Sequence, residues 1–369
     1  MADNNTTYSN EQLRDTFNKE YESFAESIGK CNILLVGITA VGKSTLVNAV
    51  FEKELAKTGT GKPITQDIRQ YSQPDCPIII YDTPGLELTG RVIQSLRGEV
   101  VTLIHQKRQL SIDNHIHFVW YCVNEQSSRF QNVEEEWIKD IAKLDVPVIV
   151  VLTQTFDPES SELLNFIKKL NLPVNDVIPV LAKPVKITKT ITIPVHGLAH
   201  LVEVTASLLP KVARTAFIVE QKVNVDLKIS EAEKYLNRYV VGAGAAGSPI
   251  SGFFGGLAVA ATQTAMIAHL TRICGLNFNF TFLVPIYTVC AAVSIPTLII
   301  VSIPGLDYAG APAAWIMTYF MGKALLFGYK QYLKGQVEGG EGEISKSELS
   351  RIIIDTYKQY VSKGTKIQK

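Results

Sequence analysis

The first half of the chain alternates short apolar runs with longer polar stretches. The runs have the length of β-strands, and the stretches between them place apolar residues on one helical face. Because the runs are apolar almost throughout, we expect an α/β fold of three layers, in which helices cover both faces of a mostly parallel sheet. The predicted strands are Cys31–Val36, Asp67–Ser72, Pro77–Tyr81, His115–Val123, Pro147–Leu152 and Asp176–Leu181, and the predicted helices are Lys43–Glu54, Arg91–Gln109, Val133–Leu144 and Ser160–Leu170.

Three segments depart from this simple alternation. Asp67–Ser72 alternates apolar and polar residues, so we expect this strand at an edge of the sheet. Asn10–Ile28 has apolar residues at helical spacing, which predicts an amphipathic helix on the outside of the domain. Ser207–Tyr239 is expected to form one long helix that leads into the second half of the chain.

Charge is almost absent from one region of the second half. Between Tyr239 and Gly322, only Arg272 and Asp307 carry a formal charge. Phe282–Ile303 is apolar and long enough to span a bilayer, which needs about 20 residues. Polar residues also interrupt the region at helical spacing, as in a soluble bundle of very apolar helices. Both interpretations stay open.

The chain ends in a linker and an amphipathic helix. Gly335–Glu343 has the Gly-rich composition of a flexible linker, and Ser345 with Glu348 has the spacing of a capping box. We therefore expect four parts. They are an N-terminal amphipathic helix (1–29), an α/β domain (30–209), an all-α apolar domain with potential for membrane association (210–334), and the linker with the final helix (335–369).

The overall charge is balanced, with 36 Lys and Arg against 35 Asp and Glu. Such a chain lacks the global basic field that gathers nucleic acid, so no direct nucleic-acid signal is present. The first 30 residues mix acidic and basic side chains and lack the apolar core of a secretory signal. We therefore expect a cytoplasmic protein, with membrane association left open.

A glycine-bearing turn follows the first predicted strand. Residues 37–44 read Gly-Ile-Thr-Ala-Val-Gly-Lys-Ser and fit the pattern GxxxxGK[ST] between a strand and a helix. In such a turn, main-chain N–H groups surround phosphate oxygens, and the helix N-terminus adds partial positive charge. Lys43 would contact the outer phosphates, and Ser44 would ligate Mg²⁺. The predicted phosphate site consists of Gly37, Ala40, Val41, Gly42, Lys43, Ser44 and Thr45.

A second motif, Asp-Thr-Pro-Gly at residues 82–85, follows another apolar run. A carboxylate at the C-terminal end of a parallel strand faces the crevice in which α/β sheets bind ligands. Asp82 can therefore hold Mg²⁺ through water. Gly85 would supply an N–H near the γ-phosphate and a hinge for the next loop.

With these two motifs, Lys30–Leu209 resembles the P-loop GTPases of the translation-factor-related class, near Era and TrmE, whose third motif also reads DTPG. The resemblance implies that a Thr in the loop before the second strand closes on the γ-phosphate and on Mg²⁺. Thr58, Thr60 and Thr65 are candidates. We favour Thr65 because it directly precedes the strand that begins near Asp67.

The motifs for base recognition match this family less closely. Its fourth motif, [NT]KxD, corresponds to Thr153, Gln154 and Asp157, where Gln replaces Lys and the Asp is one position late. Its fifth motif, SAK, corresponds to Ala182 and Lys183, and the Ala182 N–H would meet the guanine carbonyl. The resemblance favours GTP and GDP over adenine nucleotides and leaves the strictness of guanine selection open.

The resemblance implies Mg²⁺-dependent hydrolysis of GTP to GDP, with Lys43, Thr65 and Gly85 at the γ-phosphate. Ras-like GTPases carry a water-orienting Gln after the DxxG glycine, and this chain has Leu86 there. An apolar side chain cannot orient the attacking water. We therefore expect slow intrinsic hydrolysis, which a partner, self-association or another loop residue would raise.

The apolar half resembles a helical domain of unknown function that follows GTPase domains in some bacterial and eukaryotic proteins. The matching residues are Ser248-Pro249-Ile250, Gln263-Thr264-Ala265-Met266, Gly275 and Ile303-Pro304-Gly305. We expect a nucleotide-dependent switch that couples the GTPase domain to this domain, and through it to a membrane or a protein partner. Two alternatives are a dynamin-like or immunity-related GTPase that remodels membranes, and a nucleotide-binding scaffold with little hydrolysis.

Overall fold

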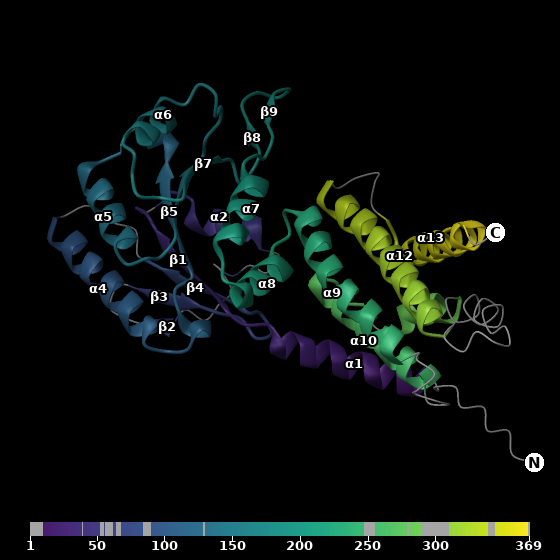
Figure 1. The fold of residues 1–369 in the computed structure, drawn as a ribbon. Helices are drawn as coiled ribbons and strands as arrows, with labels where there is room; N and C mark the ends of the chain where they lie inside the picture. The colour runs from purple at the N-terminus through teal and green to yellow at the C-terminus, as the bar shows by residue number, and fades with distance from the viewer. Residues whose placement is uncertain are drawn as a thin grey trace, which may run out of the picture. The chain divides into compact units, whose positions relative to one another are not determined.

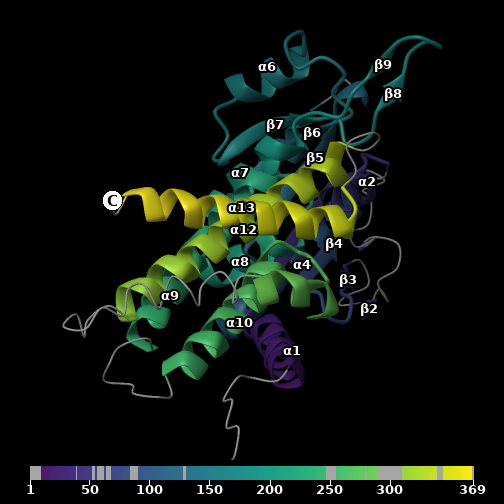
Figure 2. The ribbon, with the colours of Figure 1, turned by 90° about the vertical axis from the view of Figure 1, so that its right-hand side faces the viewer.

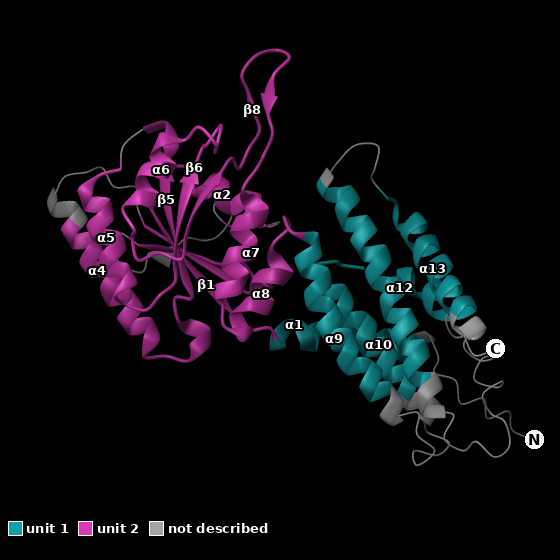
Figure 3. Ribbon diagram, turned by 45° about the horizontal axis from the view of Figure 1, so that its top comes forward, with its two compact units in different colours: residues 1–27, 225–369 teal, residues 28–224 magenta. Residues whose placement is uncertain are grey.

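The chain folds into two compact units, which Figure 3 shows in different colours. One unit is residues 28–224, and the other combines residues 1–27 with residues 225–369. The α/β unit therefore extends to Asn224 and does not end at 209, where the sequence places the boundary. The computed structural model describes residues 10–38, 40–51, 55, 62–63, 68–83, 90–127, 130–246, 255–278, 280–289, 310–338 and 344–367.

The α/β unit is built on a seven-stranded sheet with the order β2-β3-β4-β1-β5-β6-β7 (Figure 1). From β4 to β7 all neighbouring strands are parallel, whereas β2 and β3 pair antiparallel at one side. This arrangement confirms the mostly parallel sheet. The strands are β1 (Cys31–Val36), β2 (Lys62–Pro63), β3 (Arg69–Tyr71), β4 (Ile78–Asp82), β5 (Phe118–Asn124), β6 (Val148–Thr153) and β7 (Asp176–Val180).

The strand that the sequence predicts at an edge, β3, is second from the edge. β2 covers its outer side through the pairs Lys62 with Gln70 and Pro63 with Arg69. A strand of two residues has no period that a sequence pattern can reveal. The proline in it has no N–H to donate, which restricts such a strand to an outer position.

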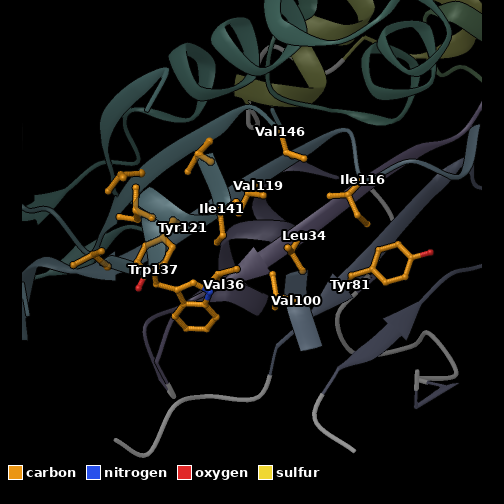
Figure 4. Packing of buried hydrophobic residues seen from close by; sticks show 14 of the residues in the cluster. Leu34, Val36, Tyr81, Val100, Ile116, Val119, Tyr121, Trp137, Ile141 and Val146 are labelled. Carbon is orange, nitrogen blue, oxygen red and sulfur yellow. The ribbon is translucent and has the colours of Figure 1, made fainter. Parts of the chain in front are cut away.

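Helices cover both faces of the sheet, as the apolar strands require. On one face, α4 (Gly90–Arg108), α5 (Asn132–Ala142) and α6 (Glu162–Lys169) bury apolar side chains against the strands, and Figure 4 shows Val100 and Trp137 packed near Leu34 and Tyr121. On the other face, Trp120 of β5 packs against Phe217, and its indole N–H donates to Thr205 Oγ1 at 3.1 Å. The helices of this face are α2 (Lys43–Val50), α7 (Leu198–Leu208) and α8 (Lys211–Glu220).

The prediction of one long helix over Ser207–Tyr239 is wrong. The segment contains the end of α7, all of α8 and the start of α9 (Val225–Ala246). Pro210 precedes α8 in an extended conformation, which its ring favours and which stops α7. Gln221 is also extended, and its side-chain oxygen accepts the N–H groups of Val223 and Asn224. Local side-chain hydrogen bonds thus replace the helical ones at this break.

In the described residues of the second unit, all regular secondary structure is helical. Besides α9 it contains α1 (Asn10–Ser27), α10 (Gly255–Ile273), a helix at 280–289, α12 (Gly310–Glu338) and α13 (Lys346–Ile367), and Figure 2 shows α1 beside α10. The prediction that the helix at Asn10–Ile28 lies on the outside of the α/β domain is wrong, because α1 belongs to the helical unit. Its Tyr21 hydroxyl donates to Leu276 O at 3.0 Å, and its Phe24 stacks on His269.

The end of the chain follows the prediction in part. α13 begins after Ser345, whose hydroxyl accepts the N–H of Glu348 at 3.2 Å, as in the predicted cap. The predicted linker Gly335–Glu343 is helical at its start, because α12 continues to Glu338.

Within the described residues, none of the helices combines the length and the apolar character that a membrane crossing demands. Of the candidate span Phe282–Ile303, residues 290–303 lie outside the described residues.

Candidate functional site

The turn between β1 and α2 has a backbone that only small residues adopt easily. Gly37 has φ +148°, and a Cβ at this position would lie 2.4 Å from Cys122 O of the neighbouring strand β5. Ala40 and Gly42 also have positive φ, of +64° and +92°. Gly42 directly precedes α2, and its carbonyl accepts the N–H of Leu46 at 2.9 Å. The turn therefore leads β1 straight into the N-terminus of a helix, as an anion site requires.

Lys43, the first residue of α2, reaches back across this turn. Its ammonium donates to Gly37 O at 2.8 Å and lies 3.9 Å from Asp82 Oδ1. The residue is only 8% exposed, so its charge is held close to the turn and is weakly screened by solvent. Ser44 is exposed and Thr45 is half-buried beside it. Val41 is buried, and its carbonyl faces Thr153.

The strand beside β1 brings Asp82 to the same edge of the sheet. Asp82 pairs in register with Leu35 of β1, and the N–H and hydroxyl of Thr83 both donate to Leu35 O at 3.1 Å. Burial raises the pKa of Asp82, and the nearby Lys43 and Arg69 charges oppose this rise. Asp82 Oδ1 is buried without a hydrogen-bond partner among the described residues.

The oxygen groups at this edge fit Mg²⁺. Asp82 Oδ1, which accepts no hydrogen bond among the described residues, and the exposed Ser44 hydroxyl are hard oxygen donors, which this ion prefers. Few protein ligands suffice because phosphates and water complete its shell. Thr65 and Gly85, the other predicted γ-phosphate residues, lie outside the described residues, as does Leu86.

The segment after β6 lies against the turn between β1 and α2. Thr153 is buried, and its hydroxyl lies 2.6 Å from Val41 O and 3.1 Å from Val123 O, so it ties β6 to the turn and to β5. Gln154 has φ +56°, and its side-chain Nε2 is 4.0 Å from the position that a Cβ on Gly42 would occupy. These contacts bring two of the predicted base-recognition residues next to the glycine turn.

Asp157 has other partners. Its carboxylate is exposed and accepts hydrogen bonds from Glu159 N at 3.0 Å and from the Ser160 hydroxyl at 2.8 Å. The Ser160 hydrogen bond, followed by the Glu159 one, lowers the pKa of Asp157. The side chain thus stabilises a local turn.

The remaining base-recognition residues follow β7. Ala182 is half-buried and Lys183 is exposed. The N–H of Thr155 donates to Val180 O at 3.3 Å, so the segments after β6 and β7 are adjacent, as a shared base site needs.

Sequence reasoning missed one residue of this region. Gln126, in the turn after β5, donates from its side chain to Gln154 O at 3.0 Å and so supports the segment after β6. Its position after a predicted strand was the only available signal, because parallel strands end at a common edge.

In this structure a turn connects a central parallel strand to a helix that begins with a lysine, and a carboxylate lies on the neighbouring strand. This combination defines the class of P-loop nucleotide-binding domains. Residues 32–178 match the family model described as 50S ribosome-binding GTPase. This part of the chain is therefore a GTP-binding domain of the P-loop GTPase class. The helical unit lies outside the match.

One curated relative is ribosome biogenesis GTPase A of Priestia megaterium (strain DSM 319 / IMG 1521), which is 33% identical over 78 residues. The match covers 21% of this chain and 27% of the relative, so the chain spans about a quarter of the length of that protein.

Solved structures with a similar domain include a single-residue variant of Aquifex aeolicus Era bound to GDP.AlF4⁻ and a probable GTP-binding protein EngB. The Era chain is 21% identical, with 50% of this chain and 58% of that chain covered and a TM-score of 0.32. The EngB chain is also 21% identical, with 42% and 90% covered and a TM-score of 0.31.

Proposed function

We propose that this protein binds GTP with Mg²⁺, hydrolyses it slowly to GDP, and acts as a nucleotide-dependent switch that involves its helical unit. The observation that carries the proposal is the buried Lys43 ammonium, 2.8 Å from Gly37 O and 3.9 Å from Asp82 Oδ1 at the head of α2. This arrangement supports a site for a charged phosphate chain, because ammonium, main-chain N–H groups and helix dipole all favour negative charge.

Each residue of the site has a role that its position supports. Main-chain N–H groups of the turn from Gly37 to Gly42 orient the phosphates, and Lys43 neutralises charge that develops on the transferred group. Ser44, Asp82 and Thr65 would hold Mg²⁺, which when bound neutralises and aligns the phosphate oxygens. Gly85 contributes an N–H near the γ-phosphate.

The residues for base selection depart from the family motif. Gln154 lies beside Gly42, so the stem of its side chain can pack against the base in place of the usual lysine. Ala182 and Lys183 lie on the adjacent segment. Asp157 pairs with guanine only after its hydrogen bonds to Glu159 and Ser160 are exchanged. We therefore expect a preference for guanine over adenine that is weaker than in GTPases with the complete motif.

The switch is expected to act through the loops of Thr65 and Gly85, which the γ-phosphate would order and hydrolysis would release. Leu86 supports slow intrinsic turnover. Membrane remodelling of the dynamin-like kind and a scaffold with little hydrolysis remain as alternatives. Phosphate release measured with and without liposomes separates the three functions. A switch shows basal turnover only, a membrane-remodelling GTPase shows lipid-stimulated turnover, and a scaffold shows neither.

The test of the phosphate site is the Lys43→Ala variant. Loss of a charge-assisted contact to phosphate should weaken mant-GTP binding about a hundredfold, or by about 3 kcal/mol. Lys139→Ala, which removes an exposed lysine elsewhere in the same unit, should leave binding unchanged. Asp82→Asn should retain GTP binding but weaken its dependence on Mg²⁺. If Lys43→Ala binds mant-GTP as tightly as the parent, the proposed site is wrong.

A further inference from the structure

Two surfaces at the C-terminal edge of the sheet have opposite chemical character. The first is a cavity of about 790 Å³ between the segments that follow β5 and β6 and the helix α6. The second is the hairpin of β8 (Val185–Lys186) and β9 (Thr192–Ile193), which follows β7 and projects from the α/β unit (Figure 3).

The cavity is acidic and aromatic. Of the described residues that line it, none is Lys, Arg or His. Glu125 Oε2 is buried there without a hydrogen-bond partner among the described residues, and the Phe166 side chain is 50% exposed. Such a cavity favours a cationic ligand that also carries apolar surface. Its acidic and aromatic residues are Glu125, Asp157, Glu162, Phe130, Phe156 and Phe166.

The hairpin is basic and aliphatic. Ile187 and Ile191 are 53% and 57% exposed and face each other across its turn, where Ile187 N donates to Ile191 O at 3.0 Å. Lys186 and Lys189 are exposed beside them, and neither Asp nor Glu occurs at any position from 177 to 202. A two-stranded hairpin with uncovered aliphatic side chains is only marginally stable alone, so a partner that covers it would stabilise it.

We propose that two copies of this chain associate through these surfaces, with the hairpin of each copy entering the cavity of the other. Lysines would meet carboxylates, and isoleucines would meet phenylalanine rings. Because one chain carries both members of the pair at one edge of its sheet, a two-fold axis satisfies both contacts at once. The cavity shares Asp157 with the candidate base site, but neither the charge pairing nor the apolar contact requires GTP hydrolysis.

A nucleic acid or a bilayer would account for fewer features of the cavity and the hairpin than a second copy does. The hairpin has no aromatic side chain on which a nucleobase could stack, which disfavours single-stranded RNA. An anionic bilayer would attract the lysines and accept the isoleucines, but it would leave the acidic aromatic cavity uncovered. A second copy accounts for both surfaces.

Charge reversal provides the test. The full-length chain is followed by sedimentation velocity over a concentration series, without nucleotide, with GDP and with a non-hydrolysable GTP analogue. Lys186→Glu/Lys189→Glu and Glu162→Lys should each weaken self-association about tenfold or more, because like charges then meet in the interface. An equimolar mixture of the two variants should associate more strongly than either alone, since each hairpin then meets a cavity of more suitable charge.

One further variant tests the apolar contact, and another serves as the control. Ile187→Ser/Ile191→Ser should weaken association without loss of folding, because both side chains are exposed. Lys30→Glu/Lys211→Glu reverses two exposed lysines that precede β1 and begin α8, and it should have no effect.

The proposal is overturned if the parent is monomeric in all three nucleotide states, or if the mixture associates no better than its components. Binding of monomeric protein to vesicles of anionic phospholipid, abolished by Ile187→Ser/Ile191→Ser, would instead assign the hairpin to a bilayer.

Discussion

The hydrogen bonds of the buried His117 side chain depend on its protonation state. Its Nδ1 accepts the N–H of Asn32 at 2.9 Å, and its Nε2 lies 3.0 Å from Ile112 O, so the neutral ring uses both nitrogens. Burial lowers the pKa of His117, and the adjacent His115 acts in the same direction.

This geometry predicts that the free energy of unfolding decreases as the pH falls. The folded state takes up the His117 proton at lower pH than the unfolded chain does, so the His117 contribution is complete above about pH 6.5 and decreases as the pH falls below it. Urea unfolding of the parent and of His117→Gln between pH 7.5 and 5.5 measures the effect. The difference between the two proteins should shrink as the pH falls, and a difference that is independent of pH would contradict the assignment.

At the turn between β1 and α2, the strand–turn–helix geometry could be predicted from the sequence because the motif is contiguous. Gly37, Gly42 and Lys43 lie within eight positions, and the turn geometry depends mainly on their own backbone preferences. Asp157 and Gln126 could not be judged in this way. Their roles depend on how the segments after β5 and β6 meet, which no local pattern encodes.

At the scale of helices, glycine has opposite effects in two positions. Gly322 on α12 faces α9, and a Cβ there would lie 2.1 Å from Leu236 Cδ1. Gly98 on α4 is exposed, and a Cβ there would meet nothing within 4 Å. Gly322 thus permits close packing of two helices, whereas Gly98 only weakens its own helix.

The two positions therefore predict changes of opposite sign. Gly322→Leu should destabilise the helical unit by about 1–3 kcal/mol through overpacking. Gly98→Ala should stabilise the α/β unit by about 0.5–1 kcal/mol through helix propensity alone. Urea titrations of the two variants measure both changes in the free energy of unfolding, provided that the m-values equal that of the parent. A stabilising Gly322→Leu would show that α9 and α12 do not need close approach.

Hydrophobic periodicity alone does not show where a helix ends. Hydrophobic periodicity continues through Ser207–Tyr239, yet Pro210 and the side-chain bonds of Gln221 divide it into three helices. The proline was visible in the sequence. The Gln221 break was not, because glutamine is an ordinary helix residue until its oxygen is placed on two following N–H groups.

At the scale of the whole molecule, the two ends of the chain share one unit. Phe24 of α1 is 7% exposed, stacks on His269 at a centroid distance of 4.2 Å, and meets the edge of Tyr235 at 5.4 Å. The N-terminal helix therefore completes the core of the helical unit.

Phe24→Ala should destabilise the helical unit by about 3–5 kcal/mol while mant-GTP affinity stays unchanged. Hydrogen exchange of α9 and α10, with mant-GTP titration in parallel, measures the two effects separately. Phe327→Ala, at a position that is 43% exposed on α12, is the matched control and should alter neither. Faster exchange in the α/β unit after Phe24→Ala would contradict this division of the chain.

The sequence by itself determined the features that contiguous residues encode: the buried parallel strands, the glycine-containing turn with its lysine, the strand-end carboxylate and the cap of the last helix. Tertiary structure alone decided which unit α1 joins, where the helix expected over Ser207–Tyr239 breaks, and that an acidic aromatic cavity and a basic hairpin share one edge of the sheet. The reason is physical. Period and turn chemistry depend on neighbours a few residues away, whereas packing partners and cavities depend on segments that meet only after the chain has folded.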